Sequence, residues 1–270
     1  MNLLPNFFII GAMKSGTSSL HHFLAAQEDF GMSSIKEPNF YAKARTPFHK
    51  SSSWYKGLFS EAKWRGESST AYTKYPFVKK VPWRIKKQVP DAKFIYIMRD
   101  PIERSLSHIT HEMLEGQIGI SKEADKFVTD TKSPFVQFSL YGLQLQQYLE
   151  HFDKSRILLL DFHELKSNPS SCVQDIFNFL GHNANIRSDV FSEKRNVSAE
   201  RKAIPDYKHY KKVMKKEGFE AAQALRVEME TPKFSDTTID KLTKIYSRDL
   251  RFIEANFQRH PEWIKTYANL

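Results

Sequence analysis

The fold is decided by one stretch near the N-terminus, Phe7-Phe8-Ile9-Ile10-Gly11-Ala12-Met13-Lys14-Ser15-Gly16-Thr17-Ser18-Ser19-Leu20. Its four leading apolar residues predict a short buried strand. Gly11 and Gly16 then bracket a tight loop, and the apolar positions from Leu20 onward have helical spacing. This order directs unpaired backbone N–H groups and the positive end of a helix dipole at one point. The stretch therefore predicts a site for a phosphate-like anion, with a chance glycine–lysine match as the alternative.

The loop differs from the Walker A pattern of nucleotide hydrolases, in which a lysine directly follows the second glycine. Here Thr17 follows Gly16, and the lysine stands earlier in the loop, at Lys14. A cation at that place would lie beside the transferred group or its bridging oxygen. We therefore expect a phosphate-bearing donor rather than ordinary ATP hydrolysis.

Length and composition favour one α/β domain, which we expect to span residues 1–270. The net charge is +10, but no nucleic-acid-binding module is recognisable, so no nucleic-acid partner is expected. No apolar run approaches the ~20 residues of a membrane span, and the first residues lack the pattern of a secretory signal. Cys172 is the single cysteine and is expected to be packed, which fits a cytoplasmic protein. The oligomeric state is not predicted.

Strand and helix patterns alternate along the chain. Strands are expected at 93–98 and 157–160, and helices at 101–115, 141–152, 169–180 and through the last third. The alternation predicts a P-loop-like parallel β-sheet flanked by helices on both faces, with a helical C-terminal region. Ligands of such sheets bind beyond the carboxyl ends of the strands, where Lys14 and Arg99 both stand.

A second motif follows the strand at 93–98, with the sequence Arg99-Asp100-Pro101-Ile102-Glu103-Arg104-Ser105-Leu106-Ser107. Asp100 is a natural N-cap, and Pro101 suits the first turn of a helix. The Arg99 guanidinium and the Ser107 hydroxyl are suited to holding a second phosphate. The alternative is that Arg99 pairs with a local carboxylate and Ser107 is a surface hydroxyl.

Together the two motifs resemble the sulfotransferase family, which transfers sulfuryl groups from 3′-phosphoadenosine 5′-phosphosulfate (PAPS). Residues 14–19 are similar to its 5′-phosphosulfate loop, and residues 99–107 to its 3′-phosphate motif. The likeness is strongest to the heparan-sulfate-type branch and its bacterial relatives. It extends to Lys36-Glu37-Pro38-Asn39-Phe40-Tyr41 and to Glu67-Ser68-Ser69-Thr70-Ala71-Tyr72.

The resemblance implies roles for individual residues. Donor binding falls to the loop residues Lys14, Ser15, Gly16, Thr17, Ser18 and Ser19, to Arg99 and Ser107 at the 3′-phosphate, and to Asn196, Arg201 and Lys202 in a later motif. Lys14 would also neutralise charge on the bridging oxygen as the sulfur–oxygen bond breaks. No metal is expected in this chemistry.

An acceptor hydroxyl needs a base, and the resemblance assigns that role to Glu37. Phe40 and Tyr41 are apolar neighbours expected to raise a carboxylate's pKa. A surface ion pair between Lys36 and Glu37 is the alternative. His108 and His111 are alternative bases, interpreted here as helix-surface histidines, because a zinc site would reverse the H-E-x-x-H order.

The chain departs from the heparan-sulfate branch at three positions. Asn39 and Ala42 stand where that branch has histidine and aspartate, and Ser68 stands where it often has lysine. We therefore expect a small-molecule hydroxyl acceptor, such as a secondary metabolite or toxin precursor, with a glycan or lipid as the alternative.

Two other functions compete with sulfuryl transfer. A P-loop kinase or ATPase is suggested by Ile157-Leu158-Leu159-Leu160-Asp161, which resembles a Walker B strand ending in a magnesium-binding acid. The missing lysine after Gly16 argues against it. A nucleotide-binding module without catalysis is the third possibility, and it would leave Glu37 dispensable.

Overall fold

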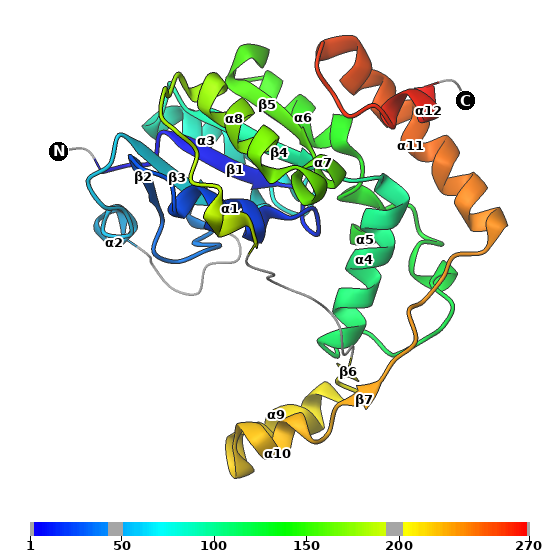
Figure 1. The fold of residues 1–270 in the computed structure, drawn as a ribbon. Coiled ribbons are helices and arrows are strands. Elements are labelled where there is room, and N and C mark those ends of the chain that lie inside the picture. Colours follow the sequence, from blue (N-terminus) through cyan, green and yellow to red (C-terminus); the bar gives the residue numbers. More distant parts are fainter. Residues whose placement is uncertain (1–2, 43–50, 193–201, 269–270) are drawn as a thin grey trace.

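Five parallel strands form the central sheet of the computed structural model, which describes residues 3–42, 51–192 and 202–268 (Figure 1). The strands are β1 (Phe7–Gly11), β2 (Phe30–Met32), β3 (Trp64–Ser68), β4 (Lys93–Met98) and β5 (Ile157–Asp161). Their spatial order is β2-β3-β1-β4-β5. The expected parallel sheet is thus confirmed, and β1 lies at its centre.

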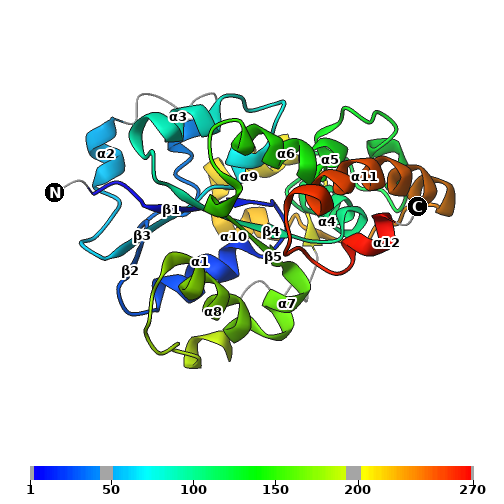
Figure 2. The same ribbon diagram turned by 90° about the horizontal axis from the view of Figure 1, so that it is seen from above.

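Helices cover both faces of the sheet, as Figure 2 shows from above. One face carries α1 (Thr17–Ala25), α7 (Phe162–Ser167) and α8 (Pro169–Leu180), and the other carries α3 (Val81–Gln88) and α6 (Tyr141–Leu149). The remaining helices are α2 (Ser52–Lys56), α4 (Pro101–Leu114), α5 (Pro134–Gln137), α9 (Tyr207–Glu217), α10 (Phe219–Gln223), α11 (Asp236–Asn256) and α12 (Ile264–Ala268). The covered faces explain why the strands are almost continuously apolar.

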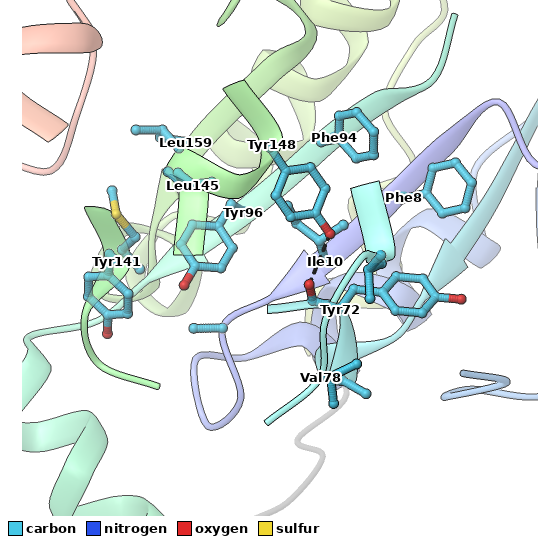
Figure 3. Close-up of a cluster of buried hydrophobic side chains, with 14 of the residues drawn as sticks. Phe8, Ile10, Tyr72, Val78, Phe94, Tyr96, Tyr141, Leu145, Tyr148 and Leu159 are labelled. Atoms are coloured by element: carbon cyan, nitrogen blue, oxygen red, sulfur yellow. Dashed lines mark hydrogen bonds between the residues drawn. The ribbon is translucent and has the colours of Figure 1, made fainter. Parts of the chain in front are cut away.

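The core is divided into two layers by the alternation of side chains along β1. Phe8 and Ile10 pack on the α6 face, whereas Phe7 and Ile9 pack on the α1 face, and all four side chains are fully buried. Figure 3 shows the α6 layer, where the Tyr148 hydroxyl donates to the Tyr72 carbonyl at 3.1 Å. Each buried side chain of this size stabilises the fold by about 1.5–3 kcal/mol, so β1 is firmly held beneath the loop that follows it.

The C-terminal third is mainly helical, as expected. α11 packs against α6 and α4 with Leu242, Tyr246, Leu250 and Ile253 buried along one stripe. Two short strands, β6 (Lys202–Ala203) and β7 (Val227–Glu228), join the α9–α10 hairpin to the far end of α4, and this hairpin projects away from the sheet in Figure 1.

Candidate active site

The loops that follow β1, β3, β4 and β5 leave the same edge of the sheet, because all five strands are parallel. After β1, the chain forms β2 and β3 on one side of β1, and then crosses to form β4 and β5 on the other side. The strand order therefore reverses between β1 and β4. Ligands of open α/β sheets bind beyond the carboxyl ends of strands at such a point. Lys14 and Arg99 follow these two strands.

Two glycines give the loop after β1 its shape. Gly11 has φ of +153° and Gly16 has φ of +87°, a region that glycine adopts without strain. A Cβ atom on Gly16 would lie 3.1 Å from the Phe162 ring and 3.2 Å from the Leu165 side chain, and one on Gly11 would overlap the Thr73 hydroxyl. A larger residue at either position would therefore strain the backbone and force neighbouring side chains to move.

The loop presents polar groups that suit an anion. Ser15 is fully buried, and its Oγ has no hydrogen-bond partner within the described residues. Ser68 Oγ, at the end of the adjacent β3, is likewise buried and unpartnered there. The Ser15 N–H donates to the Ala12 carbonyl at 3.2 Å, so the donors left for a ligand begin at Gly16, where the first turn of α1 leaves N–H groups unbonded. These groups fit a phosphate.

Lys14 is half-buried and adopts φ of +70° within this loop. It lies close enough to His111 on α4 to act on that side chain electrostatically. Burial lowers the pKa of His111, and the positive charges of Lys14 and Lys74 lower it further. The fold therefore brings the third turn of α4 within electrostatic range of the loop.

The Arg99 motif is held by the start of α4 and by α6. Asp100 caps α4, with its Oδ1 accepting from the N–H groups of Ile102 at 2.9 Å and Glu103 at 3.0 Å. The Tyr141 hydroxyl donates to the Arg99 carbonyl at 2.7 Å. These bonds fix the backbone at the residue expected to hold a 3′-phosphate.

The Arg99 side chain has a local carboxylate partner, as its alternative interpretation expected. Its Nε donates to Glu103 Oε2 at 3.0 Å, and the guanidinium lies 4.8 Å from the centre of the Phe162 ring. Within the ranges that the structure describes, its two Nη groups donate to no protein acceptor, which suits a further anion. Ser107 lies half-buried on the same helix.

Only Lys202 of the later donor motif lies within the described residues. Asn196 and Arg201 lie outside the described residues. Lys202 is exposed on β6, and two residues later the Ile204 N–H donates to the Leu114 carbonyl at the far end of α4. Its role in donor binding stays a prediction.

Glu37 is held between its neighbour Lys36 and the segment after β3. Its Oε1 accepts from Lys36 Nζ at 2.9 Å, and its Oε2 accepts from the Thr70 N–H at 2.9 Å and hydroxyl at 3.3 Å. The ion pair proposed as the alternative therefore exists, with each side chain about 30% exposed. Burial lowers the pKa of His21 on α1 to about 4, and the charges of Lys36 and Glu37 also act on it, so Glu37 lies near the helix that begins at the anion loop.

A second carboxyl, that of Glu67, lies beneath this segment and is fully buried. The aromatic residues around it include Tyr41, one of the two expected apolar neighbours of Glu37. Burial raises the pKa of Glu67 to about 7, against hydrogen bonds from Ser69, Tyr55 and Tyr72.

The surface position expected for His108 is wrong. His108 is buried between Phe135 and Phe138, and its Nε2 lies 3.5 Å from Glu112 Oε1. Burial lowers the pKa of His108 to about 4, so the ring is neutral at physiological pH. Its burial follows from the packing of α5 and the next residues onto α4, which periodicity alone does not reveal.

Residues for the competing functions have structural partners. Asp161, the acid of the Walker-B-like strand, caps α7 by accepting from the His163 N–H at 2.8 Å. Across the described ranges, no cluster of three or more His, Cys, Asp or Glu side chains is arranged to hold a metal ion. The helices in those ranges include none that is both long and apolar enough to cross a bilayer.

The sulfotransferase domain family model matches residues 4–253. The chain belongs to this family. The mouse (Mus musculus) heparan sulfate glucosamine 3-O-sulfotransferase 3B1 is 30% identical over 185 residues, which cover 66% of this chain and 46% of that protein. The human (Homo sapiens) bifunctional heparan sulfate N-deacetylase/N-sulfotransferase 2 is 27% identical over 202 residues, covering 66% of this chain and 22% of that protein. The chain thus matches less than half the length of either relative.

Two solved sulfotransferases share the fold. A sulfotransferase from Alicyclobacillus acidocaldarius superposes with a TM-score of 0.68 at 22% identity, covering 97% of this chain and 99% of that one. The mouse sulfotransferase SULT7A1 complexed with PAP gives 0.54 at 15% identity, covering 100% and 90%. The family resemblance expected from the two motifs is confirmed.

Several residues of the candidate site were not assigned a role from the sequence. The Thr70 N–H donates to the Glu37 carboxylate, and the Glu67 carboxyl accepts from the Ser69 hydroxyl. Arg104 is fully buried, and its guanidinium donates to the Phe135 carbonyl at 2.7 Å. The sequence pointed to these residues only by their position in the segments that resemble the family. Glu67 and Thr70 stand in the segment 67–72, and Arg104 stands inside the Arg99 motif. Their partners are distant in sequence, so the spacing could not supply the roles.

Proposed function

We propose that this chain transfers a sulfuryl group from PAPS to a hydroxyl group of a small molecule, as a single sulfotransferase domain. The observation that carries the proposal is the loop of residues 12–16 at the centre of the sheet edge. It holds a lysine before the second glycine and a buried Ser15 hydroxyl that has no hydrogen-bond partner among the described residues. Membership of the sulfotransferase family supports the reaction class.

The donor is bound at its two ends. Gly16, Thr17, Ser18 and Ser19 supply N–H and hydroxyl groups to the 5′-phosphate, joined by the Ser15 hydroxyl. Arg99 and Ser107 hold the 3′-phosphate, which distinguishes PAPS from ATP. The PAP complex of the structural neighbour supports a donor of this kind. Donor contacts from Asn196, Arg201 and Lys202 rest on the family resemblance alone, since Lys202 is exposed on β6 at the far end of α4.

The proposed reaction is an in-line displacement at sulfur. The acceptor oxygen forms a bond to sulfur while the bond from sulfur to the 5′-phosphate oxygen breaks, and Glu37 takes the acceptor proton. Lys14 neutralises the charge that develops on the departing phosphate oxygen. Glu37 suits the task because Lys36 and Thr70 hold both of its oxygens in place.

The acceptor is proposed to be small because Asn39 and Ala42 replace the charged and ionisable residues expected in the heparan-sulfate branch. A glycan is the second candidate, favoured by the two heparan-sulfate relatives. Labelled PAPS offered with panels of small alcohols, amines and glycans distinguishes the two. Transfer to glycans alone would contradict the small-molecule proposal.

Calorimetry with the desulfated donor, PAP, tests the donor site. PAP should bind more tightly than AMP. The substitution Arg99→Ala should lower the affinity for PAP by about 10–100-fold, because a hydrogen bond to a charged group is worth about 1.5–3 kcal/mol. Arg156→Ala is the matched control, since Arg156 pairs with Asp91 at the amino end of β5. Equal affinities for PAP and AMP in the unaltered protein would refute the role of Arg99 and Ser107.

Glu37→Gln tests the base. The amide keeps the size of the side chain but takes up no proton, so turnover should fall by at least about 100-fold, with PAP affinity retained. His111→Ala is the comparison for the alternative base. If His111→Ala abolishes turnover and Glu37→Gln does not, the base is His111.

A kinase or ATPase would need magnesium, whereas transfer assisted by Lys14 is proposed to need no metal. Turnover of labelled PAPS should therefore be unchanged by EDTA. Loss of turnover with EDTA, restored by magnesium, would overturn the metal-free mechanism.

A further inference from the structure

The Glu67 carboxyl is the shared acceptor of three hydroxyl groups beneath the segment that carries Glu37. Ser69 Oγ donates to its Oε1 at 2.6 Å, and the Tyr55 hydroxyl donates to its Oε2. The Tyr72 hydroxyl is the third group that stabilises the ionised form of this carboxyl and so lowers its pKa. The side chain is fully buried, so its hydrogen-bonding capacity is satisfied by protein groups alone.

Two of these hydroxyls also hold the backbone of the Glu37 segment. The Asn39 N–H donates to Ser69 Oγ at 3.1 Å, and the Tyr41 N–H donates to the Tyr72 hydroxyl at 3.1 Å. Each hydroxyl therefore bridges a backbone N–H of this segment to the buried carboxyl.

Tyr55, the remaining hydroxyl partner of Glu67, contacts the Glu37 segment through its aromatic ring. Tyr55 stacks on Phe40 with the ring centres 4.1 Å apart and the planes inclined by 5°. The three hydroxyl partners of Glu67 thus contact three consecutive residues, 39, 40 and 41.

The segment needs such support because its backbone is strained. Glu37 has φ of +59° and Asn39 has φ of +55°. Left-handed backbone at residues other than glycine costs on the order of 1 kcal/mol each and persists only when the surroundings impose it. Direct bonds from the Glu37 N–H to the Ser68 carbonyl and from the Thr70 N–H to the Glu37 carboxylate complete the attachment.

We propose that Glu67 is a positioning residue for sulfuryl transfer: its carboxyl orders the three hydroxyls that fix residues 39–41 and so sets the place of the Glu37 carboxylate. This inference rests on the proposed function, in which Glu37 is the base.

The charge of Glu67 makes the inference testable by pH. The groups that face it are Tyr41, Tyr55, Tyr72, Tyr148 and Glu37. An ionised carboxyl accepts from all three hydroxyls, whereas a protonated one must donate from one oxygen, so one hydroxyl turns away or reverses. Burial raises the pKa of Glu67 to about 7. Turnover should therefore decline as the pH falls through this value.

Glu67→Gln is the main test, because the amide keeps the size of the side chain but cannot accept all three hydroxyls. The kcat for sulfuryl transfer from labelled PAPS, to water and to any acceptor found by the panel, should fall at least tenfold. The Kd for PAP should stay within twofold, and the decline in kcat near pH 7 should disappear. Unchanged kcat, or equal losses in kcat and PAP binding, would overturn the inference.

Two milder variants keep the test informative if Glu67→Gln does not fold. Ser69→Ala removes the bridge to Asn39, and Tyr55→Phe removes one donor while keeping the ring on Phe40. Ser69→Ala should lower kcat more than Tyr55→Phe, with PAP affinity kept in both. Full kcat in Ser69→Ala would count against the positioning role.

Asp249→Asn is the matched control, because it makes the same change at another buried carboxyl. Asp249 accepts from the Gly142 and Leu143 N–H groups at 2.7 and 2.8 Å at the start of α6. This variant should lower the melting temperature but keep the decline in kcat near pH 7. Loss of that decline in the control would show that it reports general stability, and would overturn the inference.

Glu37→Gln separates this inference from the proposed function. If Glu37→Gln abolishes turnover and Glu67→Gln leaves kcat and its pH profile unchanged, the positioning role fails while the base stands. If Glu37→Gln retains turnover, the base assignment fails, and the positioning role fails with it.

Discussion

The proposed chemistry depends strongly on the positive charge of one side chain, that of Lys14. It lies half-buried in a loop whose backbone is fixed by Gly11 and Gly16, and its field reaches His111. A cation held in this way does not need to reorganise as negative charge develops on a leaving oxygen, which is the condition for effective electrostatic stabilisation.

Lys14→Ala should therefore lower turnover by about 10²–10³-fold, the usual effect of removing one such group. The KM for PAPS should change much less, because the bridging oxygen carries little charge before the bond breaks. Steady-state kinetics with labelled PAPS measure both quantities. Lys154→Ala, at an exposed lysine before β5, is the control and should leave both unchanged. A KM effect without a kcat effect would contradict this role.

At the scale of elements, the start of α4 joins local sequence signals to the site. Asp100 and Pro101 were predicted as N-cap and first helical residue, and the Asp100 carboxylate accepts two N–H groups of the first turn. The same carboxylate also accepts from the Tyr267 hydroxyl at 2.7 Å. One side chain thus ties the C-terminal region to the helix that begins beside Arg99.

Asp100→Ala should lower the free energy of unfolding by about 1–2 kcal/mol, the upper part of the range for a lost N-cap. It should also weaken PAP binding, because the backbone at Arg99 loses its support. Urea unfolding and calorimetry measure the two effects. Asp206→Ala removes the cap of α9 on the projecting hairpin and should leave PAP binding unchanged. Unaltered PAP affinity in Asp100→Ala would contradict the link between cap and site.

At the scale of the whole molecule, buried carboxyls make stability depend on pH. Burial raises the pKa of Asp249 to about 6, against the hydrogen bonds from the Gly142 and Leu143 N–H groups. The folded protein therefore holds a proton on this group at pH values where the unfolded chain has released it. This stabilisation is present below the ordinary pKa of aspartate, near 4, and is lost as the pH rises through about 6.

The free energy of unfolding of the unaltered protein, relative to that of Asp249→Asn, should fall by on the order of 2 kcal/mol between pH 4 and pH 7.5. Other titrating groups, such as His21 and His108, are common to both proteins and cancel in the comparison. Urea unfolding at several pH values provides the measurement. A constant difference across this range would show that Asp249 titrates normally in the folded state.

The sequence by itself determined the features that depend on neighbouring residues. The apolar run before Gly11, the cap at Asp100 and the helical pattern of the last third are local patterns, and β1, α4 and the C-terminal helices follow from them. The two motifs also indicated the family, because their residues stand at fixed spacings in one chain. The strands β2 and β3 were not predicted, since β2 is three residues long and β3 contains Gly66 and Glu67 rather than an apolar run.

Only the tertiary structure decided how these segments meet. It placed Glu67 under the segment of Glu37, His111 within electrostatic reach of Lys14, and His108 between two phenylalanine rings. The physical reason is that burial and hydrogen bonding between distant segments depend on how the helices pack on the sheet. The sequence names a glutamate or a histidine in the same way whether its side chain faces water or is buried among other groups. The pKa and the role of the side chain depend on this environment.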